Sequence, residues 1–269
     1  MSYRLLPTDE TPRRAKRHGA HFSAARQLRA PSPDEAPQRA RALTRRYEAT
    51  WLTDSGEVQS STRIAPATAL FEEAFSAMAR GTLITTDAGP VAVEDLVPGM
   101  RAITGEGRAE TITWIGSLTL YPDPQGRGIA ESMLTRITAE AFGASRPMPD
   151  LVLGPRARLL LRDARCRAIS GSDTVYVPAR AFIDGVSVIE LRTVTPVVAY
   201  HVVLKQHASL RVMGMEVESY HPGTGIEAMV EPRLLALFAA CFPHIQQLSD
   251  FGPEAHPRMT RFELEHLLE

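Results

Sequence analysis

A succession of short strand-like segments between Thr82 and about Leu120 constrains the fold more than any other feature of the chain. Each segment is rich in β-branched and apolar residues, and turns that contain Gly or Pro separate one segment from the next. The segments read TLITT, VAVEDL, MRAIT and TITWIGSLTLY. Short runs of this composition, bounded by turn residues, are typical of β-strands. The sequence therefore predicts a β-rich module in this region.

Further strand-like segments follow, so most of the chain is expected to be β. They read DLVLG, RLLLRD, TVYVPARAFIDG and VSVIELR, with a loop expected over residues 163–174. Residues 197–220 are dense in β-branched residues, which predicts a long hairpin. Upstream, YEATWLT and EVQSSTRI flank the turn residues Asp54, Ser55 and Gly56, which predicts another hairpin.

Residues 67–78 have the apolar spacing of a helix. The residues of the apolar face are Leu70, Phe71, Ala74, Phe75 and Met78. Thr68 is the expected N-cap, and Glu72 and Glu73 lie near the positive end of the helix dipole. Phe71 and Phe75 are therefore expected in the core.

The chain is also expected to end in helices, over residues 231–269. This region contains PRLLALFAACF and then TRFELEHLLE, where Thr260 and Glu263 have the spacing of a capping box. Trp114, in the alternating segment TITWIG, is expected in the core. The predicted fold class is thus mainly β, edged by helices.

The N-terminal region is basic and rich in proline. Residues 1–48 contain eleven Lys and Arg against five Asp and Glu, whereas the whole chain has a net charge of −1. Five prolines lie before residue 44, and no apolar period is sustained there. A segment of this composition cannot bury enough apolar surface to fold by itself. We therefore expect a disordered arm over residues 1–44, with nucleic-acid contact as the lesser alternative, and a single domain over residues 45–269.

Several common kinds of site are not expected. Cys166 and Cys241 lie far apart without a C-x-x-C pair, which argues against a disulfide framework or a zinc site. The G-x-G-x-x-A pattern at residues 223–228 lacks the second strand of a dinucleotide-binding unit and is interpreted as a turn. His201 and His207 could share one face of a strand. Two imidazoles without further ligands predict packed histidines rather than a metal site.

We expect neither a signal peptide nor a membrane span. The apolar run LLALFAACF at residues 234–242 is about half of the roughly 20 residues that a membrane helix needs. A cytoplasmic location is the default expectation, which leaves unconventional secretion open. No cofactor is expected, and the partner is unknown: a protein or a small ligand.

Six segments in order resemble the Hint superfamily, the fold shared by hedgehog autoprocessing domains and inteins. The resemblance covers residues 77–223 and is closest to bacterial Hint-domain proteins. The segments are GTLITTDAGPVAVEDLVPGM, TITWIG, LTRITAEAFG, DLVLGPRARLLL, YVPARAFIDGVSV and YHVVLKQHASLRVMGMEVESYHPG. The resemblance implies a compact Hint-like β-fold with flanking helices.

The resemblance also implies a reaction for which this sequence lacks the side chains. In the superfamily, a Cys or Ser at the start of the first motif attacks the carbonyl group just upstream, and this position is Ala77. A Thr/Ser-x-x-His motif then helps the amide nitrogen to leave, and its first and last positions are Gly154 and Ala157. His207 alone matches a site position, and the acidic residue often found before it is Gln206.

We therefore expect a Hint-like protein without self-cleavage that acts as a binding or structural module. The segment over residues 47–79 is expected to be part of the domain rather than a cleavable junction. The alternative is a self-processing domain with a non-standard nucleophile such as Ser76 or Thr82. Ser76 is one residue upstream of the expected position, and a one-residue shift would redirect its side chain. A third hypothesis is a nucleic-acid-associated protein that acts through the N-terminal arm.

Overall fold

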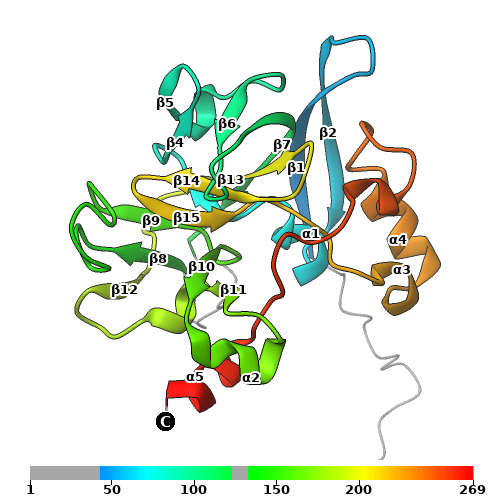
Figure 1. Cartoon of the computed structure of the whole chain (residues 1–269). Coiled ribbons are helices and arrows are strands. Elements are labelled where there is room, and N and C mark those ends of the chain that lie inside the picture. The colour runs from blue at the N-terminus through cyan, green and yellow to red at the C-terminus, as the bar shows by residue number, and fades with distance from the viewer. Residues whose placement is uncertain (1–42, 123–132, 269) are drawn as a thin grey trace, which may run out of the picture. The chain divides into compact units, whose positions relative to one another are not determined.

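The computed structural model describes residues 43–122 and 133–268, so the predicted arm lies outside the described residues apart from its last two positions. The described chain is mainly β, as predicted (Figure 1). Its strands are β1 (Thr44–Leu52), β2 (Val58–Pro66), β3 (Met78–Ala79), β4 (Leu83–Thr86), β5 (Gly89–Ala92), β6 (Arg101–Ile103), β7 (Ala109–Leu120), β8 (Leu134–Ile137), β9 (Leu151–Leu153), β10 (Arg158–Arg162), β11 (Thr174–Pro178), β12 (Val188–Leu191), β13 (Val197–Leu204), β14 (Ser209–Val212) and β15 (Met215–Glu218). Its α-helices are α1 (Ala69–Glu73), α2 (Arg167–Ser170), α3 (Ile226–Met229), α4 (Pro232–Ala239) and α5 (Arg261–Leu268).

The described strands form one sheet of 15 strands, and the neighbours within it are antiparallel. The main path runs β11-β10-β15-β14-β4-β6-β7-β13-β3-β9-β8-β12. Strand β7 is the longest and pairs with β1, β6 and β13, so it joins the N-terminal hairpin to the rest of the sheet. Helices α3 and α4 lie near the hairpin, whereas α2 and α5 lie near β10 and β11 (Figure 1). No helix in the described ranges is long and apolar enough to cross a membrane.

The predicted hairpins have different outcomes. Strands β1 and β2 pair continuously from Leu52 and Val58 to Thr44 and Pro66, which confirms the first hairpin. Residues 197–220 instead form three strands. Strand β13 pairs with β7 and β3, and the hairpin within this region is β14 with β15. The sequence pattern identifies the strands correctly but does not select the partner of β13.

The helix predicted over residues 67–78 is shorter than expected. Helix α1 ends at Glu73, and β3 begins at Met78. The Ala77 N–H donates to the Tyr200 carbonyl oxygen (2.9 Å), so the chain here is bonded to the sheet rather than to the helix. Thr68 occupies the N-cap position, but its side chain makes no capping hydrogen bond.

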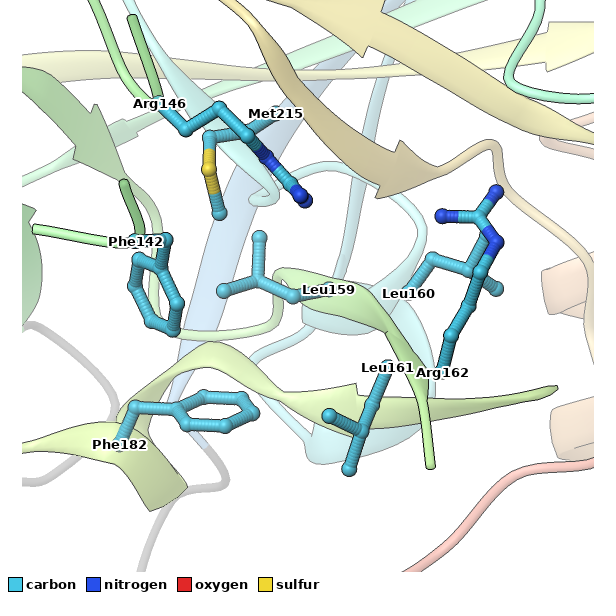
Figure 2. A pocket seen from close by; sticks show the side chains of 8 residues that line it. All are labelled: Phe142, Arg146, Leu159, Leu160, Leu161, Arg162, Phe182 and Met215. Carbon is cyan, nitrogen blue, oxygen red and sulfur yellow. The ribbon is translucent and has the colours of Figure 1, made fainter. Parts of the chain in front are cut away.

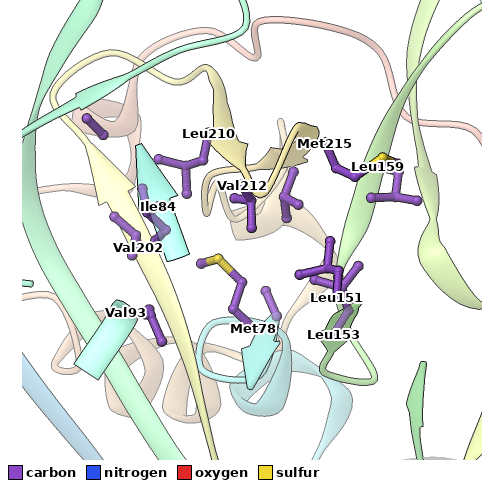
Figure 3. Close-up of a cluster of buried hydrophobic side chains, with 14 of the residues drawn as sticks. Met78, Ile84, Val93, Leu151, Leu153, Leu159, Val202, Leu210, Val212 and Met215 are labelled. Carbon is purple, nitrogen blue, oxygen red and sulfur yellow. The ribbon is translucent and has the colours of Figure 1, made fainter. Parts of the chain in front are cut away.

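Two large clusters of buried apolar side chains flank residues 74–77, the junction between α1 and β3. In one of them, Phe71, Phe75 and Trp114 are fully buried, which confirms these core predictions. The Trp114 indole N–H donates to the Cys241 carbonyl oxygen (2.9 Å) and so ties β7 to the segment after α4. Met78 belongs to the other cluster, together with β-strand residues such as Leu210 (Figure 3). The face predicted for residues 67–78 is therefore divided between two cores.

The C-terminal capping box is present, and the loop expected over residues 163–174 is not a plain loop. Thr260 and Glu263 each accept a hydrogen bond from the other's backbone N–H (3.2 and 2.7 Å), as predicted. Residues 163–174 contain a short 3-10 helix and α2, and the Asp163 carboxylate caps the 3-10 helix through the Arg165 N–H (2.9 Å). The pattern at residues 223–228 is a turn that leads into α3.

Candidate functional site

The junction between α1 and β3 contains the peptide bond that the resemblance marks as reactive, between Ser76 and Ala77. Both residues are fully buried. The Ser76 carbonyl oxygen accepts a hydrogen bond from the Arg156 N–H (3.2 Å), and the Ala77 N–H donates to Tyr200. The Ala77 carbonyl oxygen accepts a hydrogen bond from the Gly154 N–H (2.8 Å). Backbone hydrogen bonds therefore hold both sides of this peptide bond.

The fold brings three of the four predicted site positions together. Residues 154–157 lie against the junction, because Gly154 and Arg156 both donate to it. Ala77 and Ala157 are buried in the same apolar cluster, with 0% and 2% of their surface exposed. A methyl group has no lone pair and no acidic proton, so these side chains cannot act as a nucleophile or as a proton donor.

Gly154 leaves no room for a side chain. A Cβ atom at this position would lie 2.1 Å from the Ser76 carbonyl oxygen and 2.7 Å from the Ser76 carbonyl carbon. The close approach allows the hydrogen bond between Gly154 and Ala77. A Thr or Ser at position 154 therefore requires the backbone of the junction to move.

The alternative nucleophiles Ser76 and Thr82 are bonded to carbonyl groups. The Ser76 hydroxyl donates to the Glu72 carbonyl oxygen (2.6 Å), and the Thr82 hydroxyl donates to the Val152 carbonyl oxygen (3.4 Å). Both hydroxyl groups belong to buried residues. A nucleophilic hydroxyl needs a neighbouring base that accepts its proton, and a backbone carbonyl is not such a base.

His207, the fourth predicted position, is held at a different place. The Ala255 N–H donates to Nδ1 of His207 (2.9 Å), so in the neutral ring the proton is on Nε2, which faces the Ser219 carbonyl oxygen (3.0 Å). Glu218 Oε1 lies 3.5 Å from the same Nε2. Among the described residues, no hydrogen bond joins His207 to positions 76–77 or 154–157. The prediction of a packed, hydrogen-bonded histidine is confirmed.

His201 is also packed, and it lies closer to the junction. Its Nδ1 lies 2.8 Å from the Glu73 carbonyl oxygen, and its Nε2 lies 3.3 Å from the Glu218 carbonyl oxygen. Burial lowers the pKa of His201 to about 4, so the imidazole is neutral near pH 7. His201 links the end of α1 to β15 and does not carry charge into the site.

Charged residues bind the segment before the junction to the sheet. The Glu72 carboxylate is 1% exposed. It accepts a hydrogen bond from the Arg45 guanidinium group (2.5 Å) and lies 3.9 Å from the Arg156 guanidinium group. Glu73 pairs with Arg158. The sequence pattern placed Glu72 and Glu73 at the positive end of the helix dipole. In the structure their carboxylates pair with arginines of β1 and of residues 156–158.

Glu218 is the centre of a second part of this ionic network. Its carboxylate pairs with Arg158 (3.1 Å) and with Arg258 (2.8 Å), and it is 2% exposed. Burial alone would raise the pKa of Glu218, but the His207 hydrogen bond and the two guanidinium charges lower this pKa to about 2. Burial lowers the pKa of Arg158, but Glu218 and Glu73 outweigh that effect and raise it. Glu218 and Arg158 are therefore both charged.

Local sequence patterns do not predict this network, although its charged residues are visible in the sequence. Arg156 and Arg158 flank the alanine that replaces the family's histidine, and Glu72 and Glu73 precede the junction. Two arginines at alternate positions would share one face of a strand, but no spacing rule pairs residues that are 85 positions apart, as Glu73 and Arg158 are.

Comparisons with known proteins bear on the family of the chain. The family model described as Hint domain matches residues 76–224. The solution structure of a bacterial intein-like domain from Clostridium thermocellum is similar, with a TM-score of 0.39 and 13% sequence identity over 54% of this chain and 99% of that chain. No curated protein matches the sequence significantly.

Proposed function

This chain belongs to the Hint domain family, and we propose that it is a member that does not cleave itself and acts as a binding or structural module. The proposal rests on which residues stand at the processing positions. Ala77 stands at the nucleophile position, and Gly154 and Ala157 stand in the motif that assists the leaving nitrogen. None of these three side chains can donate an electron pair or a proton.

The surroundings of the junction support the proposal independently of those three residues. A cleavable junction needs an upstream segment that can depart once the bond is broken. Here β1 pairs with β7, and Phe71 and Phe75 are fully buried in an aromatic cluster with Trp114 and Phe238. The upstream segment is therefore part of the folded domain.

The ionic network adds a further restraint on the same segment. Arg45 and Glu72 pair within it, and Glu73 pairs across to Arg158 of β10. Paired buried charges are costly to separate, because each one alone would lose its compensation in a medium of low dielectric constant. Cleavage before Ala77 would leave the two fragments associated through these contacts.

The experiment that tests the proposal is the intact mass of the purified chain after prolonged incubation with a thiol or with hydroxylamine. These reagents intercept any ester or thioester. The expected result is one species of 29.5 kDa with and without the reagent. Fragments that break between residues 75 and 77 and disappear in the Ser76→Ala variant would overturn the proposal and support the self-processing alternative.

A restoration series sharpens the test. Ala77→Cys alone restores the nucleophile, and Ala77→Cys with Ala157→His also restores the proton donor. Adding Gly154→Thr completes the motif but places a side chain where a Cβ atom would lie 2.1 Å from the Ser76 oxygen. We expect no cleavage in the first variant and a loss of folded protein in the third. Efficient cleavage by Ala77→Cys alone would show that the site is otherwise intact.

A further inference from the structure

An apolar hollow lies beside β10, and none of its lining residues is one of the processing positions. Its walls come from β10, from Phe142 in the loop after β8, from Phe182 before β12 and from Met215 at the start of β15. Phe142 and Phe182 meet edge to face, with ring centroids 5.4 Å apart. Figure 2 shows these two rings on one side of Leu159, with Arg162 on the other side and Arg146 above. The volume is about 200 Å³.

A second hollow of about 330 Å³ adjoins the first, because Arg146, Arg162 and Met215 line both. Its character is different. Arg211 adds a third guanidinium group, and the one carboxylate among the described lining residues is that of Glu216. The two hollows together combine an apolar floor with a cationic rim.

The charges of this rim are unbalanced. Arg162 donates to both carboxylate oxygens of Glu216, one of these bonds measuring 2.8 Å, so this pair is neutral. Arg146 and Arg211 make no side-chain ion pair with any residue in the described ranges. A planar guanidinium group binds carboxylate and phosphate oxygens through paired hydrogen bonds, as that of Arg162 does with Glu216. Two such groups remain available at the rim.

The backbone fixes the loop that carries Arg146. Gly214 has a φ of +83°, and a Cβ atom there would lie 2.1 Å from the Ser145 carbonyl oxygen. The Met148 N–H donates to the Met213 carbonyl oxygen (3.0 Å) on the other side of the same turn. The loop therefore packs on the β14–β15 turn, and Arg146 lines the same hollow as Arg211.

We propose that these joined hollows bind a small amphipathic anion, with a short alkyl chain or a single ring on the apolar floor and a carboxylate or similar anionic group between Arg146 and Arg211. The apolar hollow, at about 200 Å³, is smaller than the roughly 300–1,000 Å³ of pockets for drug-sized ligands, so the apolar part of the ligand is expected to be small. Binding at these hollows is a separate property from self-cleavage. Titration measures binding and intact mass measures cleavage, so the two proposals can fail independently.

Isothermal titration of the full chain with octanoate tests the proposal. Octanol supplies the apolar part without the charge, and inorganic phosphate supplies an anion without the apolar part. We expect octanoate to bind at one site and at least about tenfold more tightly than either probe. Raising the salt concentration from about 0.05 M to about 0.5 M should weaken octanoate binding, because exposed charges are screened.

The Arg146→Gln, Arg211→Gln double variant removes the two available guanidinium groups. Both residues are exposed, so the variant should fold. We expect octanoate binding to weaken about tenfold or more, while Arg233→Gln, an exposed arginine of α4, leaves it unchanged. Undetectable octanoate binding, equal binding by the double variant, or equally tight octanol would overturn the proposal. Binding only to phosphatidylglycerol vesicles would also overturn it in favour of a membrane-facing surface.

Discussion

Replacing Glu218 by Gln removes the centre of the buried ionic network. The change keeps the size of the side chain but leaves the guanidinium groups of Arg158 and Arg258 without their shared carboxylate. Removing one partner of a buried pair typically costs about 3–5 kcal/mol, because the remaining charge is uncompensated. Arg158 retains Glu73 and Arg258 retains Glu254 at 3.8 Å, so we expect the lower end of this range at pH 7.

The pKa of Glu218 gives a second route to the same magnitude. The pKa falls from the ordinary 4.5 to about 2 in the folded chain. This difference corresponds to roughly 3 kcal/mol, since each tenfold change in proton affinity is about 1.4 kcal/mol. A folded-state pKa below the unfolded value stabilises the fold above pH 4.5, and this contribution is lost as the pH falls towards 2. Roughly half or more should be gone by pH 3.

Urea unfolding, followed by the fluorescence of the two buried tryptophans, Trp51 and Trp114, measures both effects. The wild-type chain and the Glu218→Gln variant should differ by about 3 kcal/mol at pH 7 and by about half of that or less at pH 3. Glu265→Gln is a suitable control, because Glu265 pairs with Arg261 on an exposed part of α5. That control should change stability by less than about 1 kcal/mol. A difference for Glu218→Gln that is below about 1 kcal/mol, or equal at the two pH values, would refute the assignment of the network.

Two substitutions and a labelling experiment probe the core and the junction. Phe75→Ala should destabilise the fold by about 3–5 kcal/mol in urea unfolding, because Phe75 is fully buried and lies against Trp114 and Tyr47; a loss below about 1 kcal/mol would place that face in solvent. Gly154→Ala should cost about 1–3 kcal/mol, because the new methyl group would collide with the Ser76 carbonyl oxygen; an unchanged unfolding midpoint would mean that the junction yields easily. Cys166 and Cys241 are both buried, and burial raises the pKa of Cys241 to about 11, so neither thiol should react with Ellman's reagent before unfolding; rapid labelling of the native chain would contradict the burial of at least one of them.

The sequence predicted the strands and the aromatic core because both depend on local patterns. Alternation in TITWIG placed Trp114 inside, and the structure leaves none of it exposed. The position of Ala77 opposite residues 154–157 came from the resemblance and not from spacing. The end of α1 could not be predicted, because residues 67–78 keep helical spacing up to Met78 while the backbone of Ala77 bonds to β13. Tertiary hydrogen bonds there override the local preference.

The roles of Glu72 and Gly154 escaped prediction for a common physical reason. Each depends on a contact between segments far apart in the chain: Glu72 with Arg45 and Arg156, and Gly154 with the Ser76 carbonyl oxygen. A local pattern contains no information about such a partner. The helix dipole accounts for Glu72 from the local sequence alone. A carboxylate that is 1% exposed needs a direct charged partner, and the N-terminus of the five-residue helix α1 does not supply one.

The junction and the network together change what the position of Ala77 does in this chain. An active processing site must hold a nucleophile and a proton donor beside a bond that is free to break, and it must leave their polar groups solvated or hydrogen-bonded. Here the methyl groups of Ala77 and Ala157 are buried in the same apolar cluster, and the charges nearby are the paired carboxylates of Glu72 and Glu73. Those carboxylates join the segments on the two sides of the junction. Ala77→Cys adds a sulfur atom at a fully buried position, so we expect it to strain the packing around the junction. Urea unfolding measures this effect on stability, and intact mass measures cleavage separately.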